Sequence, residues 1–239
     1  MSDLDAPAAL ELDDSVVVWS VAREELSERL ASEPLVVVMH GRGSHEGDLP
    51  GLFPSLPEGV VYASLRAPLN GAPYGIGGFT WFPPGVPADP APEVMAAAAG
   101  AVLAWLDRVE AEFGAPPAIA ALGFSQGGAM SIHLLRSAPH RFAAAVNLSG
   151  FAASGSLPGD EVLAELRPPL FWGRDVADPV IAASGITRTE AFVPGHFTVT
   201  ARLYPGIAHS ISLPELADVS QFLRSVLPVD PASQVPAGL

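Results

Sequence analysis

The sequence predicts an α/β fold with a mostly parallel central sheet of about seven strands and helices on both faces. Three observations predict it. Short apolar runs of four to six residues alternate with longer segments whose apolar positions recur every three or four residues. Several of the short runs are almost continuously apolar, as expected for strands buried on both faces. The chain of 239 residues is also long enough for one large domain with a substantial core.

Seven segments are expected to form the strands. In chain order they are 15–19, 35–39, 60–65, 118–122, 143–148, 169–172 and 199–203. Each is rich in β-branched or other apolar residues and is bounded by Gly, Pro or polar residues, which is typical of strands in a buried sheet.

Two helices are indicated by their apolar period and by their ends. The first places six residues on one face and ends at Gly114; these are Val94, Ala98, Val102, Trp105, Val109 and Phe113. The last helix begins with a capping box, Ser212-Leu213-Pro214-Glu215. In such a box the side chain of each end residue accepts a hydrogen bond from the backbone N–H of the other. Pro228 ends it.

The chain is expected to form a single domain over residues 15–228, after an acidic N-terminal segment (1–14) and before a flexible C-terminal tail (229–239). The segment 66–92 interrupts the alternation and is rich in Gly, Pro and aromatic residues. A loop of that length is usually functional or disordered. Its aromatic side chains favour an ordered loop that lines a pocket for substrate, and they are Tyr74, Phe79, Trp81 and Phe82.

Composition excludes several classes of function. Twelve basic against 26 acidic residues give a formal net charge of −14, so a nucleic-acid partner is not expected. No apolar run is long enough to span a bilayer, so membrane insertion is not expected. The absence of cysteine excludes disulfides, thiolate metal sites and a cysteine nucleophile, and no metal site is expected. The acidic N-terminus lacks the pattern of a signal peptide, which favours a cytoplasmic location.

The segment 121–130, ALGFSQGGAM, places Ser125 between glycines at the junction of an expected strand and helix. One interpretation is a flexible loop in which the serine has no role. The other is a nucleophile elbow, a strained turn in which small residues two before and two after the serine let strand and helix approach closely. Gly123 and Gly127 occupy those two positions, and the strand–turn–helix context favours the elbow.

An elbow serine needs a base and an acid, and in hydrolases of this kind they follow the serine in the order Asp or Glu, then His. The catalytic groups of such sheets follow the carboxyl ends of the strands. His196 precedes the last expected strand, whereas His209 follows its carboxyl end, so geometry selects His209. Asp175 and Asp178 both follow the preceding strand, and position alone leaves both open.

Four blocks carry a family resemblance, in family order: Met39-His40-Gly41-Arg42-Gly43, Gly123 through Gly128, Gly173 through Ile181, and His209. With them the chain resembles the phospholipase/carboxylesterase family of α/β-hydrolases, which includes the acyl-protein thioesterases. The resemblance implies an α/β-hydrolase fold without cofactor. The short connections outside 66–92 predict that no cap domain is present.

The resemblance also assigns roles. Together with the turn chemistry of Asp178-Pro179, it favours Asp178 as the acid, with Asp175 left as a turn residue or cap. It also supplies the backbone N–H of Arg42 as one oxyanion donor. The other donor is expected to be the N–H of Gln126, directly after the serine. Two departures from the family pattern, Ala182 for a proline and Pro83 for an aspartate, argue against the protein-depalmitoylating branch.

We therefore expect a serine esterase that cleaves carboxylic esters, with thioesters as a further option, of short to medium acyl chain. Its catalytic residues would be Ser125, His209 and Asp178, and its partner a small-molecule ester. The alternatives are a small-molecule hydrolase of the dienelactone type and a catalytically silent binding protein on the same fold. A homodimer is left open.

Overall fold

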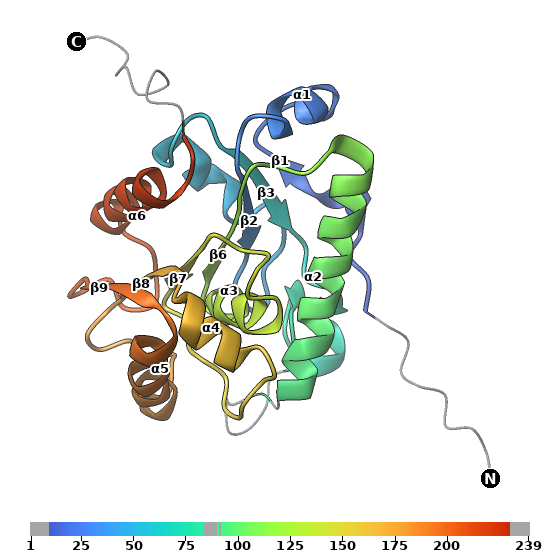
Figure 1. The fold of residues 1–239 in the computed structure, drawn as a ribbon. Coiled ribbons are helices and arrows are strands. Elements are labelled where there is room, and N and C mark those ends of the chain that lie inside the picture. Colours follow the sequence, from blue (N-terminus) through green and yellow to red (C-terminus); the bar gives the residue numbers. More distant parts are fainter. Residues whose placement is uncertain (1–9, 84–89, 91, 230–239) are drawn as a thin grey trace.

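The computed structural model of the chain describes residues 10–83, 90 and 92–229 (Figure 1). Within these residues seven strands form one sheet in the order β1-β3-β2-β6-β7-β8-β9. The strands β2, β3, β6, β7, β8 and β9 run parallel, and β1 is antiparallel to β3 at one edge. Most of the predicted N-terminal segment and almost all of the predicted tail lie outside the described residues.

Six of the seven strands lie within two residues of their predicted ends. The sheet consists of β1 (Val18–Trp19), β2 (Leu35–Met39), β3 (Val61–Leu65), β6 (Ile119–Phe124), β7 (Ala144–Leu148), β8 (Pro169–Arg174) and β9 (Thr198–Leu203). The prediction is wrong at the start of β1. Asp13 accepts a hydrogen bond from the N–H of Ser15, which closes a short 3-10 helix, η1 (Asp14–Val16), where a strand was expected.

Helices cover both faces of the sheet (Figure 1). They are α1 (Leu26–Leu30), α2 (Pro92–Phe113), α3 (Gln126–Ser137), α4 (Asp160–Leu166), α5 (Ala183–His196) and α6 (Leu213–Val226), with the 3-10 turns η2 (Arg23–Glu25), η3 (Pro50–Ser55) and η4 (Ala72–Tyr74). Helices α1 to α5 contribute to one apolar core on one face, and α6 packs against the other face beside η3. The arrangement is the predicted three-layer α/β architecture.

The ends of the two predicted helices agree with the sequence. In α6 the Ser212 hydroxyl accepts from the N–H of Glu215, and the Glu215 carboxylate accepts from the N–H of Ser212. Gly114 follows α2 with a φ of 96°, a conformation that favours glycine.

The loop 66–92 contains more regular structure than the sequence predicts, and its residues 84–89 and 91 lie outside the description. Strands β4 (Leu69–Asn70) and β5 (Phe79–Thr80) pair antiparallel, and η4 lies between them. The side chains of Trp81 and Phe82 are 0% and 5% exposed and belong to the core. This corrects the expectation that they line a substrate groove, because aromatic side chains gain more from full burial than from a place at the surface. No separate cap domain is inserted among the described elements.

Candidate active site

The chain changes direction at the centre of the sheet. It passes from β2 to β3 on one side, then to β6 on the other side of β2, so the carboxyl ends of β2 and β6 meet at the switch point. Ligands of open parallel sheets bind at such points. The loop that begins with His40 follows β2 there, and Ser125 follows β6.

Ser125 occupies the strained turn that the sequence predicts. Its φ of 56° and ψ of −114° lie outside the regions that L-residues favour, and α3 begins at the next residue. A Cβ atom on Gly123 would collide with the carbonyl of Gly127, and one on Gly127 would collide with the carbonyl of Met39. Both positions therefore require glycine if strand and helix are to approach this closely.

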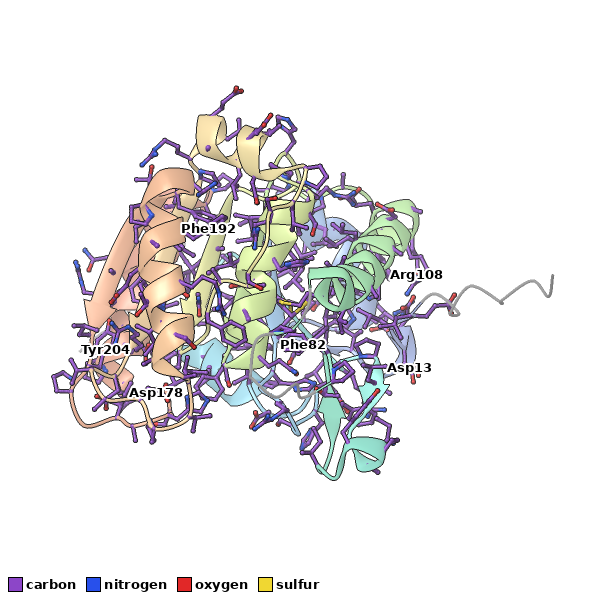
Figure 2. All side chains as sticks on the ribbon, turned by 90° about the horizontal axis from the view of Figure 1, so that it is seen from below. Asp13, Phe82, Arg108, Asp178, Phe192 and Tyr204 are labelled. Atoms are coloured by element: carbon purple, nitrogen blue, oxygen red, sulfur yellow. The ribbon has the colours of Figure 1, made fainter. Side chains whose placement is uncertain are left out.

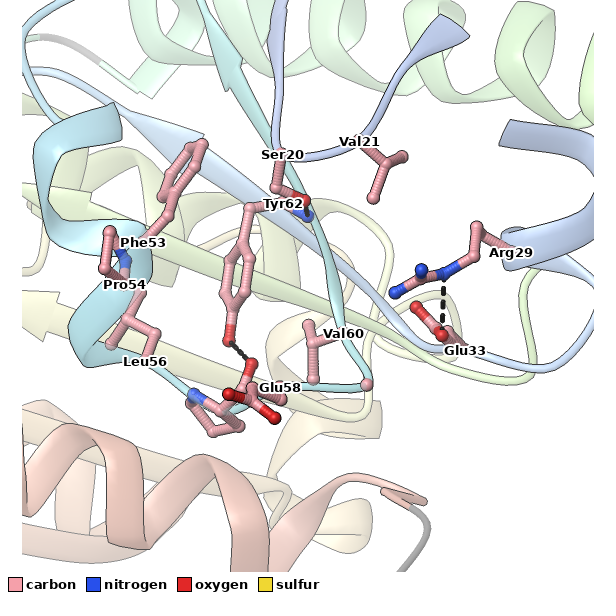
Figure 3. A pocket seen from close by; sticks show the side chains of 12 residues that line it. Ser20, Val21, Arg29, Glu33, Phe53, Pro54, Leu56, Glu58, Val60 and Tyr62 are labelled. Carbon is pink, nitrogen blue, oxygen red and sulfur yellow. Dashed lines mark hydrogen bonds and ion pairs between the residues drawn. The ribbon is translucent and has the colours of Figure 1, made fainter. Parts of the chain in front are cut away.

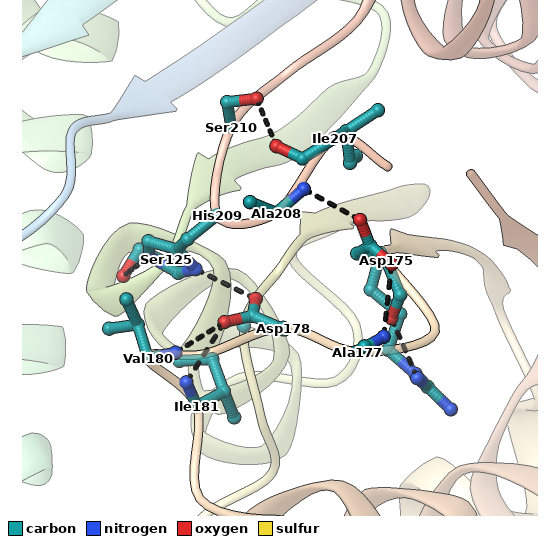
Figure 4. A network of polar contacts seen from close by, with 12 residues as sticks. Ser125, Asp175, Ala177, Asp178, Val180, Ile181, Ile207, Ala208, His209 and Ser210 are labelled. Atoms are coloured by element: carbon teal, nitrogen blue, oxygen red, sulfur yellow. Dashed lines mark hydrogen bonds and ion pairs between the residues drawn. The ribbon is translucent and has the colours of Figure 1, made fainter. Parts of the chain in front are cut away.

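The structure brings Ser125, His209 and Asp178 together in one hydrogen-bonded chain (Figure 4). Nε2 of His209 lies 2.8 Å from Oγ of Ser125. Nδ1 of His209 lies 2.7 Å from Oδ2 of Asp178. Since an ionised carboxylate only accepts, Nδ1 carries the proton and donates it, which leaves Nε2 of the neutral ring to accept from the serine hydroxyl.

Asp178 is held as a carboxylate. Its side chain is 1% exposed, and this burial opposes ionisation. The hydrogen bond from His209 and the N–H groups of Ile181 and Val180 outweigh the burial and hold the pKa of Asp178 below its usual value. The carboxylate stays charged at neutral pH and fixes the orientation of the imidazole.

Phe124 contacts the same imidazole. Its ring centroid lies 4.9 Å from that of His209. From the sequence this residue was named only as part of the serine block, and its packing against His209 was not predicted. Its position at the last residue of β6, directly before the serine, was the available signal.

The competing residues lie elsewhere. His196 ends α5 at the amino end of β9, where its Nδ1 donates to the carbonyl of Phe192 and its ring stacks on that residue at 3.9 Å. Figure 2 shows Phe192 far along α5 from Asp178. Asp175 does not contact the imidazole; its carboxylate accepts from the N–H groups of Ala177 and Ala208.

The loop after β2 lies against the elbow. A Cβ atom on Gly41 would be 3.5 Å from Cβ of Ser125, so the backbone of this loop passes directly beside the serine. His40 is buried, donates from Nδ1 to the carbonyl of Gly41 at 2.7 Å, and accepts at Nε2 from the N–H of Ala67 at 3.1 Å. Burial lowers the pKa of His40, which keeps the ring neutral and suited to both bonds. Arg42 follows in this loop with an exposed side chain.

The side chain of Gln126 joins the elbow to the loop 66–92. Its Oε1 accepts from the N–H of Trp81 at 2.9 Å and from the hydroxyl of Thr80 at 3.0 Å, and its Nε2 donates to the carbonyl of Phe82 at 2.8 Å. The indole N–H of Trp81 donates to the carbonyl of His40 at 2.9 Å. The buried aromatic pair thus fixes the two loops around Ser125 against each other, a role that sequence analysis missed.

Of the remaining aromatic candidates, Tyr74 is 40% exposed and Phe79 is partly buried. The carbonyl of Phe79 accepts from the N–H of Gly43, which places this residue next to the loop of Arg42. The guanidinium of Arg66 lies 4.5 Å from the ring centroid of Phe79 and pairs with Glu46.

Two further features bear on the kind of site. In the described part of the chain, no group of three His, Cys, Asp or Glu side chains is arranged to hold a metal ion. None of the helices over these residues is long and apolar enough to cross a membrane.

Figure 3 shows a cavity of about 700 Å³ whose lining does not include Ser125. It is lined by residues that precede β2 and β3, among them Glu33 and Gly59, so it lies at the amino ends of these strands. Tyr62, which also lines it, donates its hydroxyl to the carbonyl of Pro57. Because Ser125 follows the carboxyl end of β6, the cavity and Ser125 lie at opposite ends of the parallel strands.

Comparisons with known proteins agree with this architecture. The sequence model of the phospholipase/carboxylesterase family matches residues 25–227. Acyl-protein thioesterase 1 of Debaryomyces hansenii is 38% identical over 108 residues, which cover 44% of this chain and 47% of that protein. A protein of Oryza sativa named "probable carboxylesterase" is 29% identical over 128 residues, which cover 53% of this chain and 48% of that protein.

The matched segments span about half the length of these curated relatives. Among solved structures, esterase PE8 superimposes with a TM-score of 0.67 at 26% identity, covering 82% of this chain and 94% of its own.

Proposed function

This chain belongs to the phospholipase/carboxylesterase family, and from that premise we propose that it is a serine hydrolase of carboxylic esters that works through an acyl-enzyme intermediate. The observation that carries the proposal is the continuous chain of hydrogen bonds from Ser125 through His209 to Asp178. A serine hydroxyl is a weak nucleophile at neutral pH and requires such a base.

In the proposed reaction, Oγ of Ser125 attacks the acyl carbon while Nε2 of His209 takes its proton. The imidazolium then gives that proton to the leaving alcohol, and a water molecule repeats the sequence to release the acid. Asp178 keeps the proton on Nδ1 and stabilises the imidazolium as it forms. The bonds of Asp178 to Val180 and Ile181 support this role, because they hold the carboxylate still.

The oxyanion of the tetrahedral intermediate would be bound by the backbone N–H groups of Gln126 and Arg42. Gln126 is the first residue of α3, and the first N–H groups of a helix have no partner within it. The approach of Gly41 to Ser125 supports the assignment of Arg42, the next residue along that loop. Losing one such donor typically costs about 3 kcal/mol of transition-state stabilisation.

The proposed substrates are esters with acyl chains of short to medium length. Tyr74 and Phe79 are proposed to contact the acyl group, since they offer aromatic surface that is not fully buried. Thioesters are the second substrate class, and the name of the Debaryomyces hansenii relative favours testing them. The cytoplasmic location and the absence of a cofactor remain predictions. The sequence leaves a homodimer open, and size-exclusion chromatography with light scattering can test it.

A fluorophosphonate probe tests the proposal directly, because it reacts only with an activated serine. We expect it to label Ser125, and we expect hydrolysis of p-nitrophenyl butyrate that is lost in Ser125→Ala. A folded wild-type protein that neither reacts with the probe nor cleaves the ester would favour the binding-protein alternative. A series of p-nitrophenyl esters and acyl-thioesters of increasing chain length would then define the substrate class.

A further inference from the structure

A second carboxylate lies beside the Ser125–His209–Asp178 chain without belonging to it. Asp175 is only 3% exposed, although it sits in the loop that leaves β8. Its two oxygens serve different segments (Figure 4). Oδ1 accepts from the N–H of Ala177 at 2.9 Å, and Oδ2 accepts from the N–H of Ala208 at 2.6 Å.

These two segments carry the base and the acid. Ala177 directly precedes Asp178, and Ala208 directly precedes His209. One carboxylate therefore joins the turn that carries the acid to the loop that carries the base, next to the bond between Asp178 and His209. Along the chain Asp175 and Ala208 are 33 residues apart, so this bond fixes tertiary structure as well as the local turn.

The hydrogen bond from Ala208 to Asp175 holds a backbone conformation that is unfavourable by itself. The φ of Ala208 is 54°, in the left-handed region that is unfavourable for an L-residue with a Cβ atom. Such a conformation persists only where the surroundings enforce it. Since the φ and ψ of Ala208 set the direction of the next residue, they also decide whether the imidazole of His209 points at Ser125.

We propose that Asp175 is a positioning residue, whose carboxylate holds Ala208 in this conformation and thereby aligns His209 with Asp178 and Ser125. The expected effect of Asp175 on the reaction rate rests on the proposed function. Its expected effect on the bond between His209 and Asp178 does not. Asp175 itself touches none of the three reacting groups.

The carboxylate is suited to this role over a wide pH range. The N–H of Ala177 lowers the pKa of Asp175 most strongly, and burial opposes it. Together with the N–H groups of Ala208, Gly206 and Val176, it holds this pKa below its usual value. Asp175 therefore remains ionised at the pH of any ester assay, and both of its oxygens remain acceptors.

Asp175→Asn tests the inference, because the amide keeps the shape of the side chain but has only one acceptor oxygen. One of the two segments then faces an NH₂ group and loses its bond. We expect kcat for p-nitrophenyl butyrate to fall about 10- to 100-fold, the scale of a misplaced catalytic group. KM should change by less than about 3-fold, since substrate contacts are untouched.

Asp13→Asn is the matched control. Asp13, beside η1, also accepts from the N–H two residues ahead, that of Ser15, and Figure 2 shows it well apart from Asp178. Its activity should equal that of the wild type. In a second measurement, heteronuclear NMR of protein with isotope-labelled histidine should show faster exchange of the Nδ1 proton of His209 in Asp175→Asn than in the wild type.

Two results would overturn the inference. One is a folded Asp175→Asn variant with unchanged kcat and unchanged proton exchange at His209. The other is a loss of activity in proportion to the folded fraction, with the His209 signal of the folded protein unaltered. If the wild type itself shows no esterase activity, the proposed function fails, and the NMR comparison alone decides whether Asp175 positions His209.

Discussion

Nε2 of His209 lies 2.8 Å from Oγ of Ser125, although 84 residues separate the two along the chain. This distance is within reach for direct proton transfer. The bond joins the end of β6 to the loop after β9, and two strands, β7 and β8, lie between β6 and β9 in the sheet. The long loop that carries His209 is what closes this gap.

His209→Gln should abolish most of the activity, because glutamine cannot act as a base. We expect kcat for p-nitrophenyl butyrate to fall by at least about 10³-fold, the scale on which catalytic triads respond to loss of a member. His196→Gln is the control, since this histidine bonds to Phe192 at the other end of α5 and should be dispensable for catalysis. Equal activities of the two variants would contradict the assignment.

Asp178→Asn should act through the tautomer of His209. The amide can present an N–H to Nδ1, which moves the imidazole proton to Nε2 and leaves no acceptor for the serine hydroxyl. The corresponding change in serine proteases costs about 10⁴-fold in kcat, and a similar loss is expected here with little change in KM. Steady-state kinetics measure it, and thermal unfolding confirms that the variant is folded. A loss below about 10-fold would show that another group orients His209.

Gly127→Ala should destabilise the elbow severely. The added methyl would collide with the carbonyl of Met39 in β2, which is backbone and cannot rotate away. We expect a loss of unfolding free energy of at least about 3 kcal/mol, as for other severe steric conflicts in a core. Gly100→Ala is the matched control.

Gly100 lies in α2, and a Cβ atom there meets nothing within 4 Å. That variant should be more stable than the wild type by about 0.5–1 kcal/mol, since alanine favours a helix interior. Urea unfolding of both variants measures the contrast. A Gly127→Ala protein as stable as wild type would mean that β2 and α3 can separate.

Much of this could be predicted from sequence because the relevant signals are local. Continuous apolar runs such as that of β2 identify buried strands, and the glycines around Ser125 imply a close approach that the structure contains. The choice of His209 over His196 needed only the side of the sheet that each one faces. Family resemblance, in contrast, was needed to favour Asp178 over Asp175, because both follow β8.

The features that the sequence did not predict depend mostly on tertiary contacts. Trp81 and Phe82 look like groove residues in a glycine-rich loop, but the side chain of Gln126 and the carbonyl of His40 draw that loop into the core. The link from Asp175 to Ala208 joins segments that are distant in sequence, and no local pattern reveals it. The 3-10 turn at Asp14–Val16 was missed because Val16 and Val17 suggest a strand by composition.

The buried ion pair between Arg136 and Asp160 should be essential to stability. The side chain of Arg136 is fully buried and donates to both oxygens of Asp160 at 2.8 Å, and to the carbonyls of Ala153 and Gly155. Asp160→Asn leaves the guanidinium without a counter-charge, which typically costs about 3–5 kcal/mol.

The control is Asp107→Asn, which breaks an exposed pair with Arg141 and should cost less than about 1 kcal/mol. Chemical denaturation of both variants gives the two values. Similar costs for the two would mean that water reaches Arg136.

Glu215 should make the stability of the protein fall as pH rises. Its side chain is fully buried under the backbone of Gly173, and within the described residues its Oε1 has no hydrogen-bond partner. Burial, reinforced by the charge of Asp218 and opposed by the N–H of Ser212, raises the pKa of Glu215 to about 7 from an ordinary value of 4.5. Between these two values the folded state holds a proton that the unfolded state has lost, so unfolding becomes easier as pH increases through this range. The full effect, reached above pH 7, amounts to at most about 3 kcal/mol.

Glu215→Gln removes this dependence, because the amide is neutral at every pH and still accepts from the N–H of Ser212. Its buried NH₂ group lowers stability by an amount that does not vary with pH. Relative to the wild type, the melting temperature of the variant should therefore rise steadily from about pH 5 to about pH 8 and level off once Glu215 is ionised in the folded protein. Thermal unfolding of both proteins in the same buffers measures the difference directly, since all other titrating groups cancel. Parallel curves over this range would mean that Glu215 is already ionised in the folded state at pH 5, and that a hydrogen-bond partner or water stabilises its charge.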